Sequence, residues 1–187
     1  PKQLYVAEVS SFQLDDIKTF RPDIAILTNI TEDHLDRYDY KFENYIRSKF
    51  RIAMNQRPGD HFIYCADDEV TMKYIRDPKT IGFNILSNQL PISMRTELSK
   101  GAFIKDGDMY VRTGEDFTSM SVFDFALKGK HNQYNTMAAC VAGATMDIRK
   151  DKIREAVQDF QGLEHRMEFV ATIRGIEFIN DSKATNV

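Results

Sequence analysis

Short apolar runs that do not alternate with polar residues constrain the fold of this chain more than any other feature. They span residues 4–9, 23–30, 61–65 and 80–83. A strand that is covered on both faces reads as a continuous apolar run, as in parallel sheets flanked by helices. Helical patterns follow two of the runs, over residues 41–55 and 66–75. This order predicts an α/β fold with a mostly parallel sheet flanked by helices.

The pattern changes between about residues 90 and 127. Asp106-Gly107 between apolar flanks predicts a hairpin over residues 103–111, and residues 121–125 alternate. We interpret this stretch as a small antiparallel sheet within one domain that spans the whole chain. Helical periodicity returns over residues 131–146 and 151–160. Two strands, 167–173 and 176–179, close the chain.

Composition narrows the class of protein. The chain has 187 residues, of which 42% are hydrophobic, as expected for one compact domain. A net charge of −3 gives no electrostatic reason to expect nucleic acid or an anionic membrane. No apolar run approaches the roughly 20 residues that cross a bilayer. Cys65 and Cys140 are expected to be buried thiols. We therefore expect a cytoplasmic protein, and both ends, Pro1 and Val187, look like cuts inside a longer one.

Lys49 stands out on the predicted helix over residues 41–55. Its apolar side chains share one face at spacings of three and four, and Lys49 falls on that same face. Burial disfavours the ammonium and lowers a lysine pKa. Two interpretations stay open: a lysine that extends its ammonium to the solvent from the edge of the face, or a functional lysine, modified on its amine or held at a site.

Acidic residues and a histidine follow two predicted strands. Residues 31–36 contain His34 among carboxylates, at a strand end where open α/β sheets bind ligands. Glu8 ends the first predicted strand. Together they suggest a magnesium site, although residues 31–36 could equally cap the next helix.

Two further groups are polar. Asn132 and Asn135 share one face of a predicted helix start, where they could read a nucleotide, or Asn132 could cap the helix. Asp181, Lys183 and Thr185 fall in a dense loop after the last predicted strand, typical of either a phosphate or carboxylate site or a solvated loop.

In combination these segments resemble the Mur ligase family. The motifs occupy residues 8–14, 29–38, 129–132, 163–166 and 178–186, and the resemblance runs from Glu8 to Val187. The string Asn-Asp-Ser-Lys-Ala-Thr-Asn at residues 180–186 resembles the branch that adds D-glutamate to UDP-N-acetylmuramoyl-L-alanine. The resemblance implies a central ATP-binding domain of the phosphate-loop type, and amide formation driven by ATP through an acyl phosphate.

The resemblance also implies roles for individual residues. Glu8 and His34 would bind magnesium, and Lys49 would carry a carbamate that helps to place the metal. His34, Lys49 and Lys183 would form the catalytic set. Other residues would contact the nucleotide: Asn135 the adenine, and Arg166 and Asp181 the phosphates and ribose. The substrates would be contacted by Ser10 and Asn29 at the UDP-sugar, and by Lys183 and Thr185 at the carboxylates of D-glutamate.

The chain departs from the family pattern in one respect. The family's glycine-rich phosphate loop, ending Gly-Lys-Thr or Gly-Lys-Ser, is absent from the sequence. We therefore expect a truncated central domain without the amino-terminal UDP-binding and carboxy-terminal domains, inactive alone. An exposed sheet edge would favour self-association between chains. Two alternatives stay open: a sister Mur or folylpolyglutamate ligase, or a non-catalytic module that binds a nucleotide or a partner.

Overall fold

A six-stranded mixed sheet forms the centre of the computed structural model, which describes residues 3–114, 116–160, 162, 164, 166 and 168–182. The strands lie in the order β1-β2-β3-β4-β5-β6. Neighbours from β1 to β4 run parallel, and β4, β5 and β6 run antiparallel. The expected α/β class is confirmed. The strand bounds are Ile24–Leu27, His61–Cys65, Asn88–Ser93, Gly101–Lys105, Asp108–Thr113 and Asp116–Ser121.

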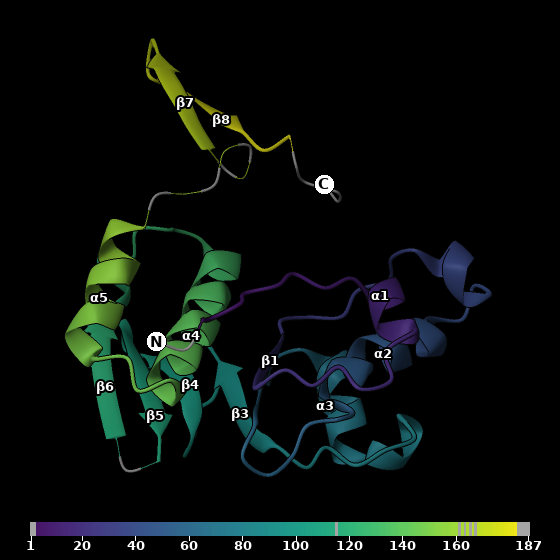
Figure 1. Ribbon diagram of the computed structural model, residues 1–187. Helices are drawn as coiled ribbons and strands as arrows, with labels where there is room; N and C mark the ends of the chain where they lie inside the picture. Colours follow the sequence, from purple (N-terminus) through teal and green to yellow (C-terminus); the bar gives the residue numbers. More distant parts are fainter. Residues whose placement is uncertain are drawn as a thin grey trace.

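Helices cover both faces of this sheet (Figure 1). Side chains of β2 show the division: Phe62 and Tyr64 belong to one apolar cluster with α2 and α3, and Ile63 and Cys65 to another with α4. The α-helices are α1 (Ser11–Asp15), α2 (Phe42–Phe50), α3 (Glu69–Arg76), α4 (Lys130–Thr145) and α5 (Lys150–Asp159). The 3₁₀ turns are η1 (Leu35–Tyr38), η2 (Arg51–Ala53), η3 (Pro78–Thr80) and η4 (Val122–Asp124).

The predicted hairpin is confirmed as β4 and β5. Its turn residues, Asp106 and Gly107, have φ of 52° and 85°, the left-handed pair that a tight two-residue hairpin requires. The antiparallel strands continue the parallel sheet through the pairing of β3 with β4. The strand expected at residues 121–125 is wrong, because β6 ends at Ser121 and η4 follows.

Two other predicted strands are wrong. Residues 4–9 lie outside any strand: β1 is an edge strand, and no described segment pairs with its outer edge. Leu4, Tyr5 and Val6 are 67%, 82% and 102% exposed as a result. Residues 80–83 end η3 and enter a turn. The strand that follows β2 is β3 instead, where Pro91 interrupts the apolar pattern. Self-association through the β1 edge stays a prediction.

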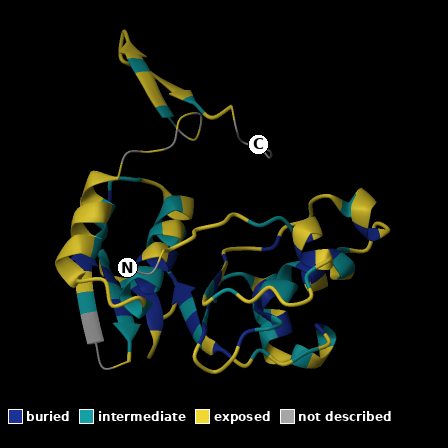
Figure 2. Cartoon of the chain, in the orientation of Figure 1, coloured by how far each residue is buried: buried dark blue, intermediate teal, exposed yellow. Residues whose placement is uncertain are grey.

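The two closing strands are confirmed as β7 (Glu168–Ile173) and β8 (Ile176–Asn180). They pair only with each other and stand apart from the helices and the main sheet, with most of their residues exposed (Figure 2). Cys65 and Cys140 are buried free thiols, as expected, and burial raises the pKa of Cys140 to about 12. Among the described residues, no helix has the length and apolar character needed to cross a membrane.

Candidate functional site

Side chains of α2 and η2 bind the backbone of α1 and of the residues that follow it. Ser48 Oγ donates to the Ser11 carbonyl at 2.6 Å. Arg51 donates to the Leu14 carbonyl at 2.7 Å and to the Ile17 carbonyl at 3.0 Å. These carbonyls include the last ones of a short helix, which lack partners within the helix itself. The contacts make α1 and α2 one structural unit around the loop that follows β1.

His34 lies in that loop, and Asp33 controls its orientation. The backbone of His34 is left-handed, with φ of 50°, and its amide donates to Asp33 Oδ1 at 2.9 Å. The imidazole Nε2 lies 3.6 Å from Asp33 Oδ2. One face of the histidine is bounded by Phe12 of α1, whose ring meets it edge-on at 6.3 Å between centroids. The side chain of His34 is still 53% exposed, so a ligand can reach it.

Lys49 lies on α2, partly buried, with its ammonium 5.0 Å from the centre of the Tyr45 ring. Burial lowers the pKa of Lys49, while the negative charge of Asp33 opposes that shift. The lowered pKa agrees with the place of Lys49 on the apolar face of α2, and a role for its amine stays a prediction. Within the described residues, no carboxylate forms an ion pair with Lys49. A partly buried amine with a lowered pKa has a larger neutral fraction, and the neutral form is the nucleophile.

Asp33, His34 and Lys49 together form what we call the Asp33 cluster. Asp33 acts electrostatically on both Lys49 and Tyr45, which links the loop after β1 to α2. In the sequence, Asp33 is one of several acidic residues within 31–36 and does not stand out. Its position directly before His34 was the available signal, since a carboxylate beside a histidine commonly orients the ring.

The cluster suits a divalent cation only in part. Among the described residues, no three His, Cys, Asp or Glu side chains gather into a metal site. Magnesium, however, often takes only one or two carboxylates from protein and keeps several waters. Asp33 supplies one such carboxylate, and a carbamate on Lys49 would supply another oxygen ligand. The residues of the cluster thus fit magnesium if Lys49 is carbamylated.

Three other predicted residues lie near the amino-terminal end of the fold. Glu8 is exposed on the unpaired segment before α1 and forms no ion pair with His34 in the described structure. Ser10 precedes α1 and bonds to Gln13 Oε1 through its amide at 2.9 Å and its hydroxyl at 2.8 Å. Asn29 is exposed just after β1. The structure thus places Ser10 and Asn29 beside the strand end, but it does not bring Glu8 to His34.

Asn135 is exposed on α4, next to a residue that fixes this helix to the sheet. Tyr134 donates its hydroxyl to Asp67 at 2.7 Å, just beyond β2. Burial, and after it that hydrogen bond, raises the pKa of Tyr134. Gly129 is the residue that caps α4, so the alternative of Asn132 as the cap is wrong. The side-chain amide of Asn132 donates to the Lys128 carbonyl at 2.8 Å instead.

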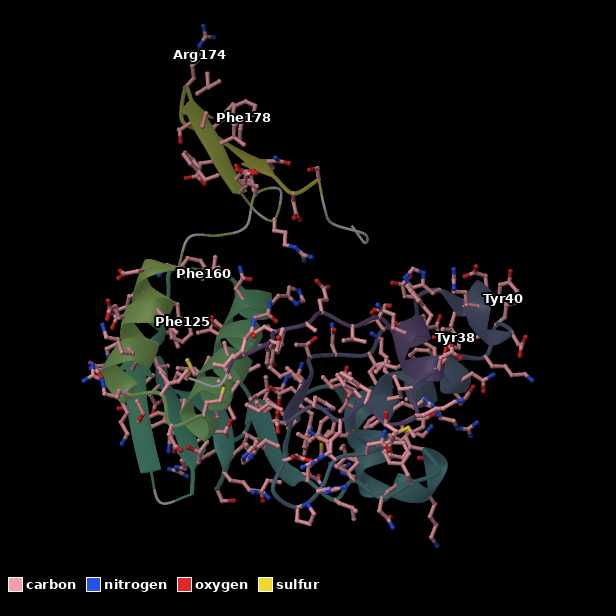
Figure 3. The ribbon with its side chains drawn as sticks, viewed as in Figure 1. Tyr38, Tyr40, Phe125, Phe160, Arg174 and Phe178 are labelled. Atoms are coloured by element: carbon pink, nitrogen blue, oxygen red, sulfur yellow. The ribbon has the colours of Figure 1, made fainter. Side chains whose placement is uncertain are left out.

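The remaining predicted residues belong to the end of the chain. Arg166 and Asp181 are exposed on either side of the β7–β8 hairpin. Figure 3 shows the hairpin side chains Arg174 and Phe178 far from Tyr38, next to the Asp33 cluster. Arg166 and Asp181 flank that hairpin in the chain, and their place at the phosphates and ribose stays a prediction. Lys183 and Thr185 lie outside the described residues.

Comparison with known sequences gives a consistent result. Residues 2–143 match the family model described as the Mur ligase middle domain. The chain is 50% identical over 184 residues to the UDP-N-acetylmuramoylalanine–D-glutamate ligase of Christiangramia forsetii, covering 98% of this chain and 40% of that protein. It is 46% identical over 183 residues to the enzyme of the same name from Bacteroides fragilis, with the same coverage. The chain spans about 40% of the length of these relatives.

Solved structures share the fold at low sequence identity. MurF from Acinetobacter baumannii aligns with a TM-score of 0.63 and 18% identity, over 86% of this chain and 34% of that one. MurC from Thermotoga maritima aligns with a TM-score of 0.63 and 18% identity, over 92% of this chain and 36% of that one. These alignments show a common architecture for the sheet and its flanking helices.

Proposed function

Because this chain belongs to the Mur ligase family, as its middle domain, we propose that the whole protein adds D-glutamate to UDP-N-acetylmuramoyl-L-alanine in peptidoglycan precursor synthesis. The relatives that support the proposal carry the name of that ligase and are 42–50% identical to this chain. The reaction would use ATP. A structural neighbour, MurF from Thermotoga maritima, is described in complex with ADP, with a TM-score of 0.57. ATP and a UDP-linked sugar as substrates favour the cytoplasm as its location.

The proposed reaction forms one amide bond for each ATP. The carboxylate of the L-alanyl group attacks the γ-phosphorus of ATP, ADP leaves, and an acyl phosphate results. The amine of D-glutamate then attacks the acyl carbon, loses a proton and expels phosphate. Both steps develop negative charge on oxygen, which cations and hydrogen-bond donors stabilise.

Within the chain, the environment of Lys49 is the observation that supports the proposal. A lysine that only extended to solvent would keep its ammonium hydrated, whereas Lys49 is partly buried, has a lowered pKa and has no partner carboxylate among the described residues. In the proposal its neutral amine adds to carbon dioxide and loses a proton. The resulting carbamate turns a cation into an anion next to Asp33 and His34.

Magnesium would then have Asp33 and the Lys49 carbamate as oxygen ligands, with His34 beside them. When bound, the metal would offset the phosphate charge of ATP. The part of Asp33 in this arrangement is also to orient His34 through the His34 amide. Glu8 would join the site only if the segment before α1 changed position, because it is now exposed and unpaired. We retain Ser10 and Asn29 as proposed contacts to the UDP-sugar, Asn135 to the adenine, Arg166 and Asp181 to the phosphates and ribose, and Lys183 and Thr185 to D-glutamate.

The carbamate can be tested on this chain directly. The protein would be equilibrated with ¹³C-bicarbonate at pH 8, and its carbon NMR spectrum compared with that of Lys49→Arg. We expect a carbamate carbon signal that is present in the original chain and absent from Lys49→Arg, since arginine keeps its charge and forms no such adduct. Lys152→Arg, at an exposed lysine on α5, is the matched control and should keep the signal.

The activity is tested on the full-length protein. ATP-dependent phosphate release would be measured with UDP-N-acetylmuramoyl-L-alanine and a panel of amino acids. Release that requires D-glutamate supports the proposal. Release with another amino acid would assign the protein to a sister ligase, and a folded full-length protein without any release would favour a non-catalytic binding module.

A further inference from the structure

A cavity of about 660 Å³ lies between α3 and the turn that follows β3. Its lining combines residues from three places in the chain: the end of β2, the exposed side of α3 and the residues after β3. The polar lining residues are Asp67, Glu69, Lys73, Arg76, Arg95 and Thr96. None of them belongs to the Asp33 cluster. We call this cavity the basic cavity, because three of its side chains are cationic.

Asp67 makes the inner wall of the basic cavity rigid. Its carboxylate accepts hydrogen bonds from Ser93 Oγ at 2.6 Å, from the Met94 amide at 2.7 Å and from Tyr134 at 2.7 Å. Ser93 Oγ in turn accepts the Arg95 and Thr96 amides at 3.0 and 2.8 Å. The backbone that carries Arg95 is thus fixed before any ligand binds. Preorganised groups bind with a smaller entropic cost than mobile ones.

The charge within the cavity is unbalanced. Lys73, Arg76 and Arg95 form no ion pair with a carboxylate in the described part of the chain. Asp67 and Glu69 are the acids in the lining, so its three cations leave a formal excess of one positive charge, and the oxygens of Asp67 already accept three hydrogen bonds. Cations in the last turn of a helix interact favourably with the helix dipole, which accounts for Lys73 and Arg76 at the carboxyl end of α3. It does not explain Arg95, which approaches the same cavity from the turn after β3.

We propose that the basic cavity binds a phosphate-bearing small molecule. Arginine and lysine on opposite walls can hold a phosphate group by several charge-assisted hydrogen bonds at once. The volume lies within the range of about 300–1,000 Å³ that is usual for small-molecule sites. A long polyanion such as nucleic acid is disfavoured by the net charge of −3 and by Glu69 at the cavity. The proposal is independent of the Asp33 cluster and of the ligase activity.

The test is a titration of the ¹⁵N-labelled chain with inorganic pyrophosphate, followed by NMR in 0.15 M NaCl. We expect saturable shifts at the amides of Arg95, Thr96 and Lys73. In Lys73→Gln/Arg95→Gln, affinity should fall at least about tenfold, because the variant loses the charge-assisted hydrogen bonds of two cations. The matched control, Lys18→Gln/Lys152→Gln, removes the same charge at two exposed lysines elsewhere and should leave the affinity unchanged.

Three results would overturn the proposal. The first is the lack of saturable shifts at 0.15 M NaCl. The second is binding at other amides, and the third is an equal loss of affinity in both double variants, which would show that only net charge attracts pyrophosphate. The amide spectra of both variants would first be compared with the original spectrum to establish that they fold. Because the readout uses no turnover, its failure would leave the proposed ligase activity untouched.

Discussion

The six-stranded sheet and the β7–β8 hairpin use similar strands but end in opposite environments. In the sheet, Phe62, Ile63 and Ile92 are fully buried between helices. In the hairpin, Phe169, Ile176 and Phe178 are 61%, 63% and 47% exposed. The sequence predicts β2 and both hairpin strands from the same kind of apolar run. The difference teaches that a strand pattern predicts an extended segment, whereas burial depends on an element that covers its face.

The difference also has an energetic side. Burying a large apolar side chain contributes about 1.5–3 kcal/mol, so the sheet gains stability from its helices that the hairpin lacks. An isolated two-stranded hairpin is marginally stable in water. We call the six-stranded sheet and its flanking helices the body. We therefore expect substitutions in the sheet to change the stability of the whole body, and substitutions in the hairpin to change the stability of the hairpin alone.

The largest expected effect comes from Gly101→Ala, at the start of β4. Gly101 has φ of 90°, and a Cβ there would lie 1.8 Å from the Pro91 carbonyl oxygen. Strain and overpacking together should cost about 3 kcal/mol or more, measured by urea unfolding. Gly175→Ala in the hairpin turn is the matched control, because its φ is 80° but nothing lies within 4 Å of the added carbon. Similar losses in both variants would contradict the expected contrast.

Asp60→Asn should have the next largest effect. Asp60 is buried and accepts from Arg21 Nε and Nη2, both at 2.7 Å, and from the Arg57 amide at 2.6 Å. The variant should lose about 1–3 kcal/mol at pH 7. Arg21 holds the pKa of Asp60 below its usual value, so this stabilisation is present above about pH 4 and is lost as the pH falls through the lower, folded pKa. Urea unfolding between pH 3 and 7 measures this stabilisation. The expectation would be refuted if Asp60→Asn lost stability at acid pH as steeply as the original chain.

Lys49→Met should stabilise the chain by up to about 1 kcal/mol at pH 7, since it removes a partly buried charge and keeps the apolar stem. The folded pKa of Lys49 is lowered, so the unfolded chain binds more protons between the folded and unfolded values. The original chain should therefore gain stability as the pH rises toward about 10.4, and the advantage of Lys49→Met should shrink. A difference that stays constant with pH would show that charge burial is not its cause.

Phe178→Ser in β8 should have the smallest effect. The free energy of unfolding of the body should change by less than about 0.5 kcal/mol, because Phe178 is exposed and its strand pairs only with β7. Hydrogen exchange should show fast amides in the hairpin both before and after the change. A large loss of body stability would mean that the hairpin packs on the body in solution.

Some elements could be predicted from the sequence to the residue. His61–Cys65 forms a continuous apolar run without proline, and β2 has those bounds. The partial burial of Lys49 agrees with its place on an apolar face of the predicted helix. In contrast, Pro91 hid β3, and the run at residues 4–9 reads as a strand although no described segment pairs with it. Strand patterns are local, whereas pairing depends on segments elsewhere in the chain.

The candidate site was predictable to a similar degree. His34 and Lys49 were found from strand ends and periodicity, and the structure links both to Asp33. Glu8 was suggested by a predicted strand end and Asp181 by a dense polar loop, and the resemblance supplied their roles. Glu8 forms no ion pair with His34 in the described residues, and Asp181 follows the separate β7–β8 hairpin. Their distances depend on how the first segment and the hairpin are oriented, which no local pattern specifies. Asp33 was overlooked because three of residues 31–36 are acidic, and a pattern of charges does not show which one faces the histidine.

Asp67 has a consequence for how mutational data on this chain should be read. One carboxylate joins the end of β2, the residues after β3 and the first turns of α4. Ser93→Ala and Tyr134→Phe each remove one donor to it, and Asp67→Asn weakens all three hydrogen bonds at once. In a double-mutant cycle, their effects on unfolding should therefore deviate from additivity, even though Ser93 and Tyr134 lie on opposite sides of a helix–sheet boundary.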